Sequence, residues 1–489
     1  MPAMSDTSSG MAFPTRRLTA LVLVVLVLAR IRIDTLAEAA VLPLRLQDVA
    51  RHPWLGRLLP QRAMSLLAQQ QLVDPIALLL IVGALGCLLA YLVAEELVRS
   101  DRARYRVSLV LIWAIVLLTV VAPSLKLTLL RHNSGPASYS HDGGVIQTEA
   151  TIDMLLQGRN PYVEDYLTTP MAEWGIGEFR TALFHYPYLP WTFLFSAPFK
   201  LAAERIIGWY DQRFVYLLLF VFTLLLLPGL GRGPEQKLLL VMLISLNPIM
   251  GSDLIYGQND SFVLAWLVLC LWLWLRDRRA RAARGQKVTS SGWALGSAAA
   301  LGLACASKPT AWFLVPFYIV LASGELATDL RRRPGAWLAG VLRIFWPTML
   351  VATVIIGPYL LWNAPAMFDD VWRWANGTSP TAYQIWGWGA SNLVLATGWV
   401  PDRFAYWPFW VLQLAFCLPL LVLLLWRQAR ENNIARALWG YGLFLLAFLF
   451  FSRFLNENYL GYIAALLALG ALADPMPGQA PTNSVGDSQ

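Results

Sequence analysis

The chain alternates between long apolar runs and short polar connectors. A bilayer core about 30 Å thick is crossed by roughly 20 apolar residues in a helix, or somewhat fewer where neighbouring helices bury the ends. We therefore predict an all-α fold, a polytopic bundle of transmembrane helices. The candidate runs are Leu18–Ile33, Pro75–Ala94, Val107–Ser124, Tyr188–Ala202, Phe214–Leu230, Leu238–Met250, Ser261–Leu275, Trp293–Ala306, Thr310–Ala322, Leu338–Trp362, Phe404–Trp426, Leu438–Phe451 and Tyr459–Leu472.

Four arginine-rich connectors fix the direction of these runs, because Lys and Arg gather on the cytoplasmic side of a membrane. They are residues 99–106, 276–287, 331–333 and 427–436. Counting from these connectors places residues 127–185 on the outer face. To keep the number of crossings even, we expect Tyr188–Ala202, which contains Pro190 and Pro198, to be re-entrant or interfacial. About twelve crossings then remain, with both termini in the cytoplasm.

The amino-acid composition also indicates a membrane protein. Of 489 residues, 57% are hydrophobic and 14% are charged, whereas soluble domains carry about 25% charged residues. The net charge of +8 lies in the connectors, so it indicates membrane topology and membrane lipids as partners, and no nucleic acid. All four cysteines fall in apolar runs, which predicts neither disulfides nor a zinc site. The run after Arg16 and Arg17 resembles a signal sequence, but arginines follow it and no cleavage site does, so we interpret it as a retained anchor.

The chain divides into four regions. Residues 1–126 form a transmembrane region with extra hydrophobic segments, 127–187 form the first large outer loop, and 188–473 form the transmembrane core. Residues 474–489, rich in Pro, Gly and Ser, are expected to be a disordered cytoplasmic tail.

The first outer loop contains the strongest candidate for chemistry. Gln147–Leu156 has apolar residues three or four apart and predicts a short amphipathic helix on the membrane surface. Asp142 comes just before it, and Gly143 and Gly144 would let a ligand approach the backbone. An exposed, unpaired carboxylate at this position can accept a proton. The alternative is that Asp142 only caps the helix or solvates a turn.

Three further polar groups lie on the same predicted face, where ionisable residues at the ends of spans indicate function. Tyr256–Asp260 is a polar turn of the kind that hydrogen-bonds sugars, although Asn259 or Asp260 could simply cap a helix. Lys308 could hold a phosphate or merely extend to the interface. The third group lies in the turn before the last apolar run and combines the cation of Arg453 with the carboxylate of Glu457. The alternative is that these two residues only pair with each other.

The later outer loop, residues 363–402, is rich in tryptophan. Aromatic faces beside Tyr383 and Gln384 would suit a sugar or lipid acceptor. Anchoring of Trp at the membrane interface is the more common explanation.

The ordered set of these motifs resembles the GT-C membrane glycosyltransferases, and within them the polyprenol-phosphate-mannose-type enzymes of glycosyltransferase family 87. The matching pieces run from His141 to Tyr459: HDGG, LLQGRNPY, FHYPYLPWTFLFSAPF, LNPIMGSDLIYGQND, ASKPT and ENY. Two positions depart from the family pattern. Tyr188 replaces a proline, and Asn456 stands where relatives often have a histidine.

The resemblance implies an inverting transfer of a sugar, mannose by analogy, from a polyprenyl-phosphate donor to a lipid or glycan hydroxyl. The enzyme would be a multi-pass protein of the inner (plasma) membrane with its active site facing the periplasm. Asp142 would be the general base, and Lys308 and Arg453 would stabilise the donor phosphate. No metal or other cofactor is expected, because the long loop has no Asp-x-Asp pair. The residues expected to bind sugar or acceptor are His185, Tyr186, Gln258, Asn259, Asp260, Glu457 and Tyr459.

Two other functions are compatible with this pattern. A transporter or lipid flippase would also have about a dozen spans, but it would be expected to bury charges near the middle of the membrane. A ligase or polymerase that moves whole lipid-linked glycans would use a similar outer face. The gathering of polar residues at one face favours an interfacial enzyme.

Overall fold

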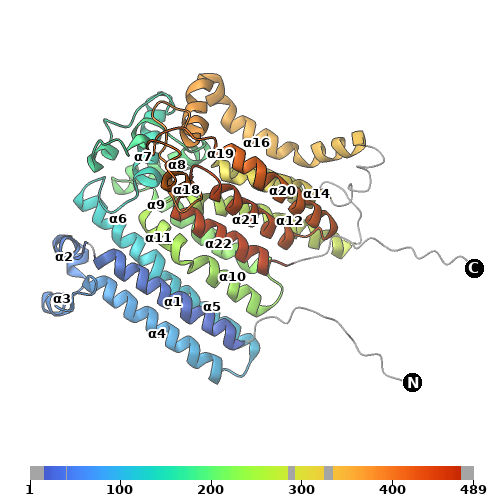
Figure 1. Ribbon diagram of the computed structural model, residues 1–489. Helices are drawn as coiled ribbons and strands as arrows, with labels where there is room; N and C mark the ends of the chain where they lie inside the picture. The colour runs from blue at the N-terminus through green and yellow to red at the C-terminus, as the bar shows by residue number, and fades with distance from the viewer. Residues whose placement is uncertain (1–15, 40, 285–291, 324–333, 475–489) are drawn as a thin grey trace, which may run out of the picture.

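The computed structural model describes residues 16–39, 41–284, 292–323 and 334–474. The fold is an all-α bundle whose long helices run side by side (Figure 1). The strands within those ranges are one parallel pair, β1 (Trp386–Gly387) and β2 (Phe454–Leu455). The predicted all-α class is therefore confirmed. Residues 475–489 of the predicted tail 474–489, the connector 331–333 and residues 285–287 lie outside the described residues.

The N-terminal helices form one side of the bundle. Long helices α1, α4 and α5 lie together, and α1 also packs on α10 and α11 (Figure 1). A π-helical turn, η2 (Leu117–Val121), joins α5 to α6. The elements of this part are α1 (Arg16–Ala39), α2 (Leu42–Arg51), η1 (Leu55–Arg57), α3 (Gln61–Ala68), α4 (Pro75–Leu97), α5 (Asp101–Val116) and α6 (Ala122–Ser134).

The remaining elements form the outer loops and the central bundle. Those of the first loop are η3 (Asp142–Ile146), α7 (Gln147–Leu156), η4 (Pro170–Trp174) and η5 (Thr181–Phe184). The next are α8 (Trp191–Ile207), α9 (Arg213–Leu226), η6 (Leu227–Leu230), α10 (Pro234–Ser245), α11 (Pro248–Tyr256), α12 (Asp260–Arg284), α13 (Gly292–Cys305), η7 (Pro309–Leu314) and α14 (Val315–Ala322). The last are α16 (Pro334–Phe368), η8 (Asp369–Arg373), α17 (Trp374–Asn376), α18 (Ser391–Ala396), α19 (Phe409–Leu412), η9 (Gln413–Cys417), α20 (Leu418–Arg430), α21 (Ile434–Phe450) and α22 (Glu457–Leu472).

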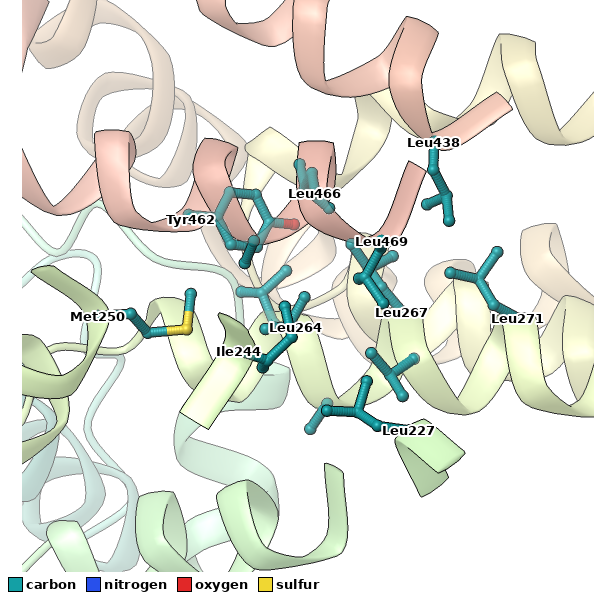
Figure 2. Close-up of a cluster of buried hydrophobic side chains, with 14 of the residues drawn as sticks. Leu227, Ile244, Met250, Leu264, Leu267, Leu271, Leu438, Tyr462, Leu466 and Leu469 are labelled. Atoms are coloured by element: carbon teal, nitrogen blue, oxygen red, sulfur yellow. The ribbon is translucent and has the colours of Figure 1, made fainter. Parts of the chain in front are cut away.

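The core is centred on α12, whose apolar part is buried on nearly all sides. A helix that is hydrophobic all round belongs inside a bundle. Leu264, Leu267 and Leu271 of α12 lie among side chains from α10, α21 and α22, including Tyr462 and Leu469 (Figure 2). This packing fixes the start of α12, at Asp260, relative to the start of α22.

Five helical segments are long and apolar enough to cross a membrane, counted by length and composition over the described residues. They are Pro75–Leu97, Asp101–Ser134, Arg213–Leu230, Leu338–Asn376 and Phe409–Arg430. Four shorter apolar helices accompany them: Gly292–Cys305, Pro309–Ala322, Ile434–Phe450 and Glu457–Leu472. The fold is thus a polytopic transmembrane bundle, and the count of twelve crossings stays a prediction.

One predicted run, Leu238–Met250, is broken in the structure. Helices α10 and α11 meet there at a bend of 49°. Asn247 caps α11 by accepting hydrogen bonds from the backbone N–H groups of Ile249 and Met250, and Pro248 occupies the first turn. Because proline has no N–H and a cap needs an extended residue, the run cannot continue as one straight helix. The bend points Tyr256 and the turn after it toward the outer loops.

The outer-loop elements gather at one end of the bundle. Figure 1 shows α2, α3, α7, α8 and α18 at the same end, whereas α1 begins and α22 finishes at the opposite end. Helix α8 corresponds to the predicted re-entrant run, and its Lys200 pairs with Asp153 of α7 at 3.0 Å. This contact holds α8 against the outer loop, and its interfacial placement stays a prediction.

Candidate functional site

Helix α7 has the bounds that the sequence predicted, Gln147–Leu156. It does not lie on an open surface, however, because six of its ten residues are buried. The Gln147 amide donates to the carbonyls of Ala182 and His185, both at 2.8 Å, so the rest of the loop folds over it. The predicted surface position of the helix is therefore wrong, and the loop forms a small packed body on the bundle.

The turn before α7 is pressed against the turn after α11. The backbone N–H of His141 donates to the Tyr256 carbonyl at 2.7 Å, and the Tyr216 hydroxyl donates to the Gly144 carbonyl at 2.5 Å. A Cβ on Gly144 would lie only 2.0 Å from the carbonyl oxygen of Gly257, so no other residue fits there. The same Cβ would lie 3.0 Å from the Cα of Gln258. Close approach of two backbones thus explains Gly144, where the sequence predicted room for a ligand, and places Asp142 beside the predicted sugar-binding turn.

Asp142 is not the unpaired carboxylate that the sequence suggested. Its Oδ2 lies 2.6 Å from Nη1 of Arg180, and its Oδ1 accepts the backbone N–H of Gly143 at 2.7 Å. The Asp142 side chain is 18% exposed, which leaves it in reach of a ligand. Arg180 lies in an aperiodic part of the loop, between η4 and η5, and sequence reasoning missed it.

Lys308 adopts an extended conformation between α13 and η7. Its Nζ lies 2.7 Å from Oδ1 of Asp260 and 3.1 Å from Oδ1 of Asn259. The ammonium also lies 4.9 Å from the ring centroid of Tyr459 and 5.6 Å from that of Tyr188. The structure therefore brings the predicted residues Asn259, Asp260, Lys308 and Tyr459 together around one buried cation.

Helix α22 completes this group at its first turn. Asn458 donates a hydrogen bond from its side-chain amide to Oδ2 of Asp260. Glu457, the first residue of the helix, is exposed. Glu457 is therefore available to a ligand at the edge of the group, whereas the Lys308 ammonium pairs with Asp260 and Asn259.

Tyr188 connects the Asp142 turn to the Lys308 group. Its hydroxyl oxygen lies 3.0 Å from the position that a Cβ on Gly143 would take, while its ring lies under the Lys308 ammonium. One aromatic side chain thus contacts both the turn that carries Asp142 and the Lys308 ammonium.

Electrostatics around His141 support this proximity. Burial lowers the pKa of the His141 imidazole below its usual value. The carboxylates of Asp142 and Asp260 act in the opposite direction. The cations Lys308 and Arg180 add to the lowering. Charges from both halves of the site therefore act on one imidazole.

The later outer loop reaches into the same cluster through Tyr383. Its hydroxyl accepts a hydrogen bond from the Asn456 amide at 3.2 Å. Burial raises the pKa of Tyr383 to about 12, and the charges of Tyr459 and Asp142 contribute. The Asn456 Oδ1 is buried and has no hydrogen-bond partner among the described residues, which leaves one acceptor free for a ligand hydroxyl.

Arg453 lies outside the group around Lys308 and packs into the later outer loop. Its guanidinium donates to the backbone carbonyls of Tyr383, Arg403, Phe404 and Ala405 at 2.5–3.0 Å, and the residue is 2% exposed. Burial lowers its pKa to about 10. The guanidinium is used to fold the later loop, so a phosphate could reach it only by displacing those carbonyls. The alternative pairing with Glu457 is absent from the described part of the chain, and the role of Arg453 toward a phosphate stays a prediction.

His185 and Tyr186 join the two outer loops. The His185 Nδ1 lies 2.7 Å from Oδ1 of Asp370, and its Nε2 lies 2.6 Å from the Thr381 hydroxyl. The backbone N–H of Tyr186 donates to Oδ2 of Asp370 at 2.8 Å, and the Tyr186 ring is fully buried. In this arrangement His185 positions the loops, whereas the Tyr186 ring packs edge-on against the ring of Tyr188, with the centroids 5.4 Å apart.

One set of residues has the spacing of a metal site. Among the residues that the structure describes, ligand atoms of His185, Asp369 and Asp370 all lie within 4.8 Å of one another. Hydrogen bonding already engages His185 with Asp370, and Arg373 lies 2.9 Å from Asp369. The predicted absence of an obligatory metal stays a prediction.

Comparison with known proteins gives limited information. No model of a protein family matches the sequence, and no curated protein matches it. Among solved structures, the chain is similar to the crystal structure of ArnT from Cupriavidus metallidurans bound to undecaprenyl phosphate. The TM-score is 0.39 at 16% identity, covering 68% of this chain and 55% of that chain. The chain thus matches just over half the length of that protein, and its function has to be inferred from its own residues.

Proposed function

We propose that this chain is an integral membrane glycosyltransferase that moves a sugar from a polyprenyl-phosphate donor to a hydroxyl of a lipid or glycan acceptor. The observation that carries this proposal is that Tyr188 contacts both polar groups: its hydroxyl lies beside Gly143, next to Asp142 in the chain, and its ring lies under the Lys308 ammonium. A lipid-linked donor keeps its tail among the helices and its phosphate at the membrane interface. A site for it needs a carboxylate and a cation close together at that depth.

In the proposed reaction the acceptor hydroxyl attacks the anomeric carbon of the sugar. Asp142 accepts the hydroxyl proton as the new C–O bond forms. The bond between the anomeric carbon and the phosphate oxygen breaks, and the electron pair leaves with the polyprenyl phosphate. Attack from the face opposite the phosphate inverts the anomeric configuration. Lys308 offers its remaining N–H to the charge that develops on the phosphate.

The polar groups around these two residues suit a sugar. Gln258, Asn259 and Glu457 offer amide and carboxylate groups at the edge of the site, and Tyr383 and Asn456 close it from the later loop. We propose mannose as the sugar, by analogy with family 87 of the GT-C enzymes. The periplasmic face of the inner (plasma) membrane is the corresponding location, and no cofactor is required.

The test is sugar transfer by purified protein in nanodiscs, with a radiolabelled polyprenyl-phosphate mannose donor. We expect transfer by the wild type and its loss in Asp142→Asn and Lys308→Ala. Asp165→Asn is a matched control, since Asp165 lies in the same loop and caps a turn through the backbone N–H of Leu167. Full activity in Asp142→Asn would reject the assigned base.

A transporter or flippase is the second candidate, favoured by charges buried in the N-terminal helices. The Lys126 ammonium lies 3.1 Å from Oε1 of Glu38 and also contacts the carboxylate of Asp74. Arg30 pairs with Asp34 within α1. These charges pair with one another, as expected of a structural anchor between helices. Movement of a fluorescent polyprenyl phosphate across proteoliposomes, unchanged in Asp142→Asn, would favour this alternative.

A further inference from the structure

Arg180 holds its guanidinium in a fixed position against the predicted base. In addition to the contact with Asp142, its Nη2 donates to the Met171 carbonyl at 2.8 Å. The guanidinium carbon lies 5.5 Å from the ring centroid of Trp174, within cation–π range. The Nε is buried and has no hydrogen-bond partner among the residues the structure describes. Arg180 therefore presents an unsatisfied donor at the site.

The other two cations considered for the phosphate are more fully committed. Lys308 is neutralised by Asp260 and held by Asn259. Arg453 is bound by four backbone carbonyls of the later loop. Of these three cations, Arg180 is the one that combines a free N–H group with direct contact to Asp142.

The Arg180 pair also limits what Asp142 can do. Protonation of Asp142 would break its ion pair with Arg180, so the pair has to open before the carboxylate can take up the acceptor proton. Phosphate oxygens offer the guanidinium fork an equally good, bidentate partner. A phosphate entering beside Asp142 thus competes with it for Arg180.

We propose that Arg180 binds the donor phosphate and that the Arg180–Asp142 pair is a latch, which the phosphate opens by taking the guanidinium from Asp142. This inference rests on the proposed function, and it adds a regulation: the base becomes free only when a donor is bound. In the absence of donor, Asp142 stays paired and does not activate an acceptor hydroxyl or water.

The latch makes an unusual prediction about binding. Because Asp142 and the phosphate compete for one guanidinium, removing the Asp142 charge increases the affinity for a phosphate. Coupling between two such sites typically changes an affinity by about 5- to 150-fold. Asp142→Asn is therefore expected to bind polyprenyl phosphate more tightly than the wild type while it loses sugar transfer.

The experiment measures binding of undecaprenyl phosphate to the full chain in phosphatidylcholine nanodiscs, with the neutral alcohol undecaprenol as the matched ligand. The proteins are the wild type, Asp142→Asn, Arg180→Gln and the double variant. Arg180→Gln is expected to weaken binding of the phosphate at least tenfold and to leave the alcohol unaffected. The double variant is expected to lose the gain seen in Asp142→Asn.

Arg159→Gln is the matched control, because Arg159 lies in the same loop, is 45% exposed and pairs with Glu164. It is expected to bind as the wild type does. Asp142→Asn carries the test even if Arg180→Gln does not fold, since Asn keeps the side-chain shape and an acceptor for Gly143. Binding of the phosphate by Asp142→Asn that is unchanged or weaker overturns the latch.

Failure of the latch and failure of the proposed function give different results. If the wild type transfers no sugar but phosphate binding follows the pattern above, the latch holds and the transferase assignment is rejected. If the wild type transfers sugar and Arg180→Gln binds the phosphate normally, the transferase stands and the latch is rejected.

Discussion

The ammonium of Lys308 lies 2.7 Å from the carboxylate of Asp260, and both groups are almost fully buried. The second oxygen of Asp260 is held by the Asn458 amide, so this pair ties the α13–η7 turn to the starts of α12 and α22. The contact therefore has a structural role in addition to any role toward a phosphate.

Substitution of Lys308 separates these two roles. Lys308→Ala leaves the Asp260 carboxylate buried and unpaired, which is expected to destabilise the protein by about 3–5 kcal/mol. The double variant Lys308→Met/Asp260→Asn leaves no uncompensated charge. It is expected to recover most of that stability but to remain inactive in sugar transfer. Thermal unfolding in detergent and the transfer assay measure the two effects. Lys237→Ala, in α10, is the matched control, and transfer by the double variant at the wild-type rate would remove Lys308 from the reaction.

Arg453 is predicted to act on folding alone. Arg453→Ala leaves four carbonyls of the later loop without their donor, and each unsatisfied buried group costs about 1–3 kcal/mol unless water reaches it. We expect a large drop in the unfolding temperature, together with an unchanged KM for the donor in the protein that remains folded. A KM raised tenfold at normal stability would restore Arg453 to the phosphate site.

The contact between the outer loops should depend on pH through Asp370. Burial, partly offset by the hydrogen bond from His185, raises the pKa of Asp370 from its ordinary value of 3.8 to about 6. Because the folded state binds the proton more tightly, ionisation as the pH rises from about 4 to 7 costs the folded state roughly 3 kcal/mol. Asp370→Asn lacks this cost.

Unfolding temperatures of wild type and Asp370→Asn at pH 4.5 and 7.5 test this sign. The variant is expected to gain stability relative to the wild type as the pH rises. His185 contacts Asp370 and also Asp369, which in turn pairs with Arg373. All three neighbours remain in both proteins, so their contributions largely cancel. A difference between the two proteins that stays constant with pH would contradict the raised pKa.

Chelation is predicted to leave sugar transfer intact. A monophosphate donor carries little charge to neutralise, and the chain supplies cations of its own at the site. Dialysis against EDTA should change the rate less than about twofold. If activity is lost and returns with Mg²⁺ or Mn²⁺, the prediction is wrong, and Asp369→Asn then tests whether the His185 cluster holds the ion.

Local patterns predicted much of the site. The apolar spacing of residues 147–156 gave the bounds of α7. The two glycines after Asp142 indicated a close approach to the backbone, but the expected partner was a ligand, and at Gly144 it is the backbone of Gly257. The direction of the spans, read from the arginine-rich connectors, placed the turns around Asn259 and Lys308 at the same end. Those signals are local or depend only on counting, so one sequence is enough to reveal them.

Contacts between segments that are distant in the chain, or that lack periodicity, could not be predicted from the sequence. Arg180 lies 38 residues from Asp142 in a stretch without helical or strand periodicity, and nothing in its neighbours marks its partner. The carbonyls that bind Arg453 lie about 50 to 70 residues earlier in the chain. Backbone acceptors exist at every residue, so a sequence does not indicate which ones a buried arginine will find.

The most direct measurement is the single-turnover rate constant of sugar transfer from bound polyprenyl-phosphate donor, compared between wild type and Asp142→Asn. If Asp142 is the general base, the rate constant falls by about 10²–10⁴-fold, while donor binding is retained or strengthened. Equal rate constants in the two proteins would contradict the account.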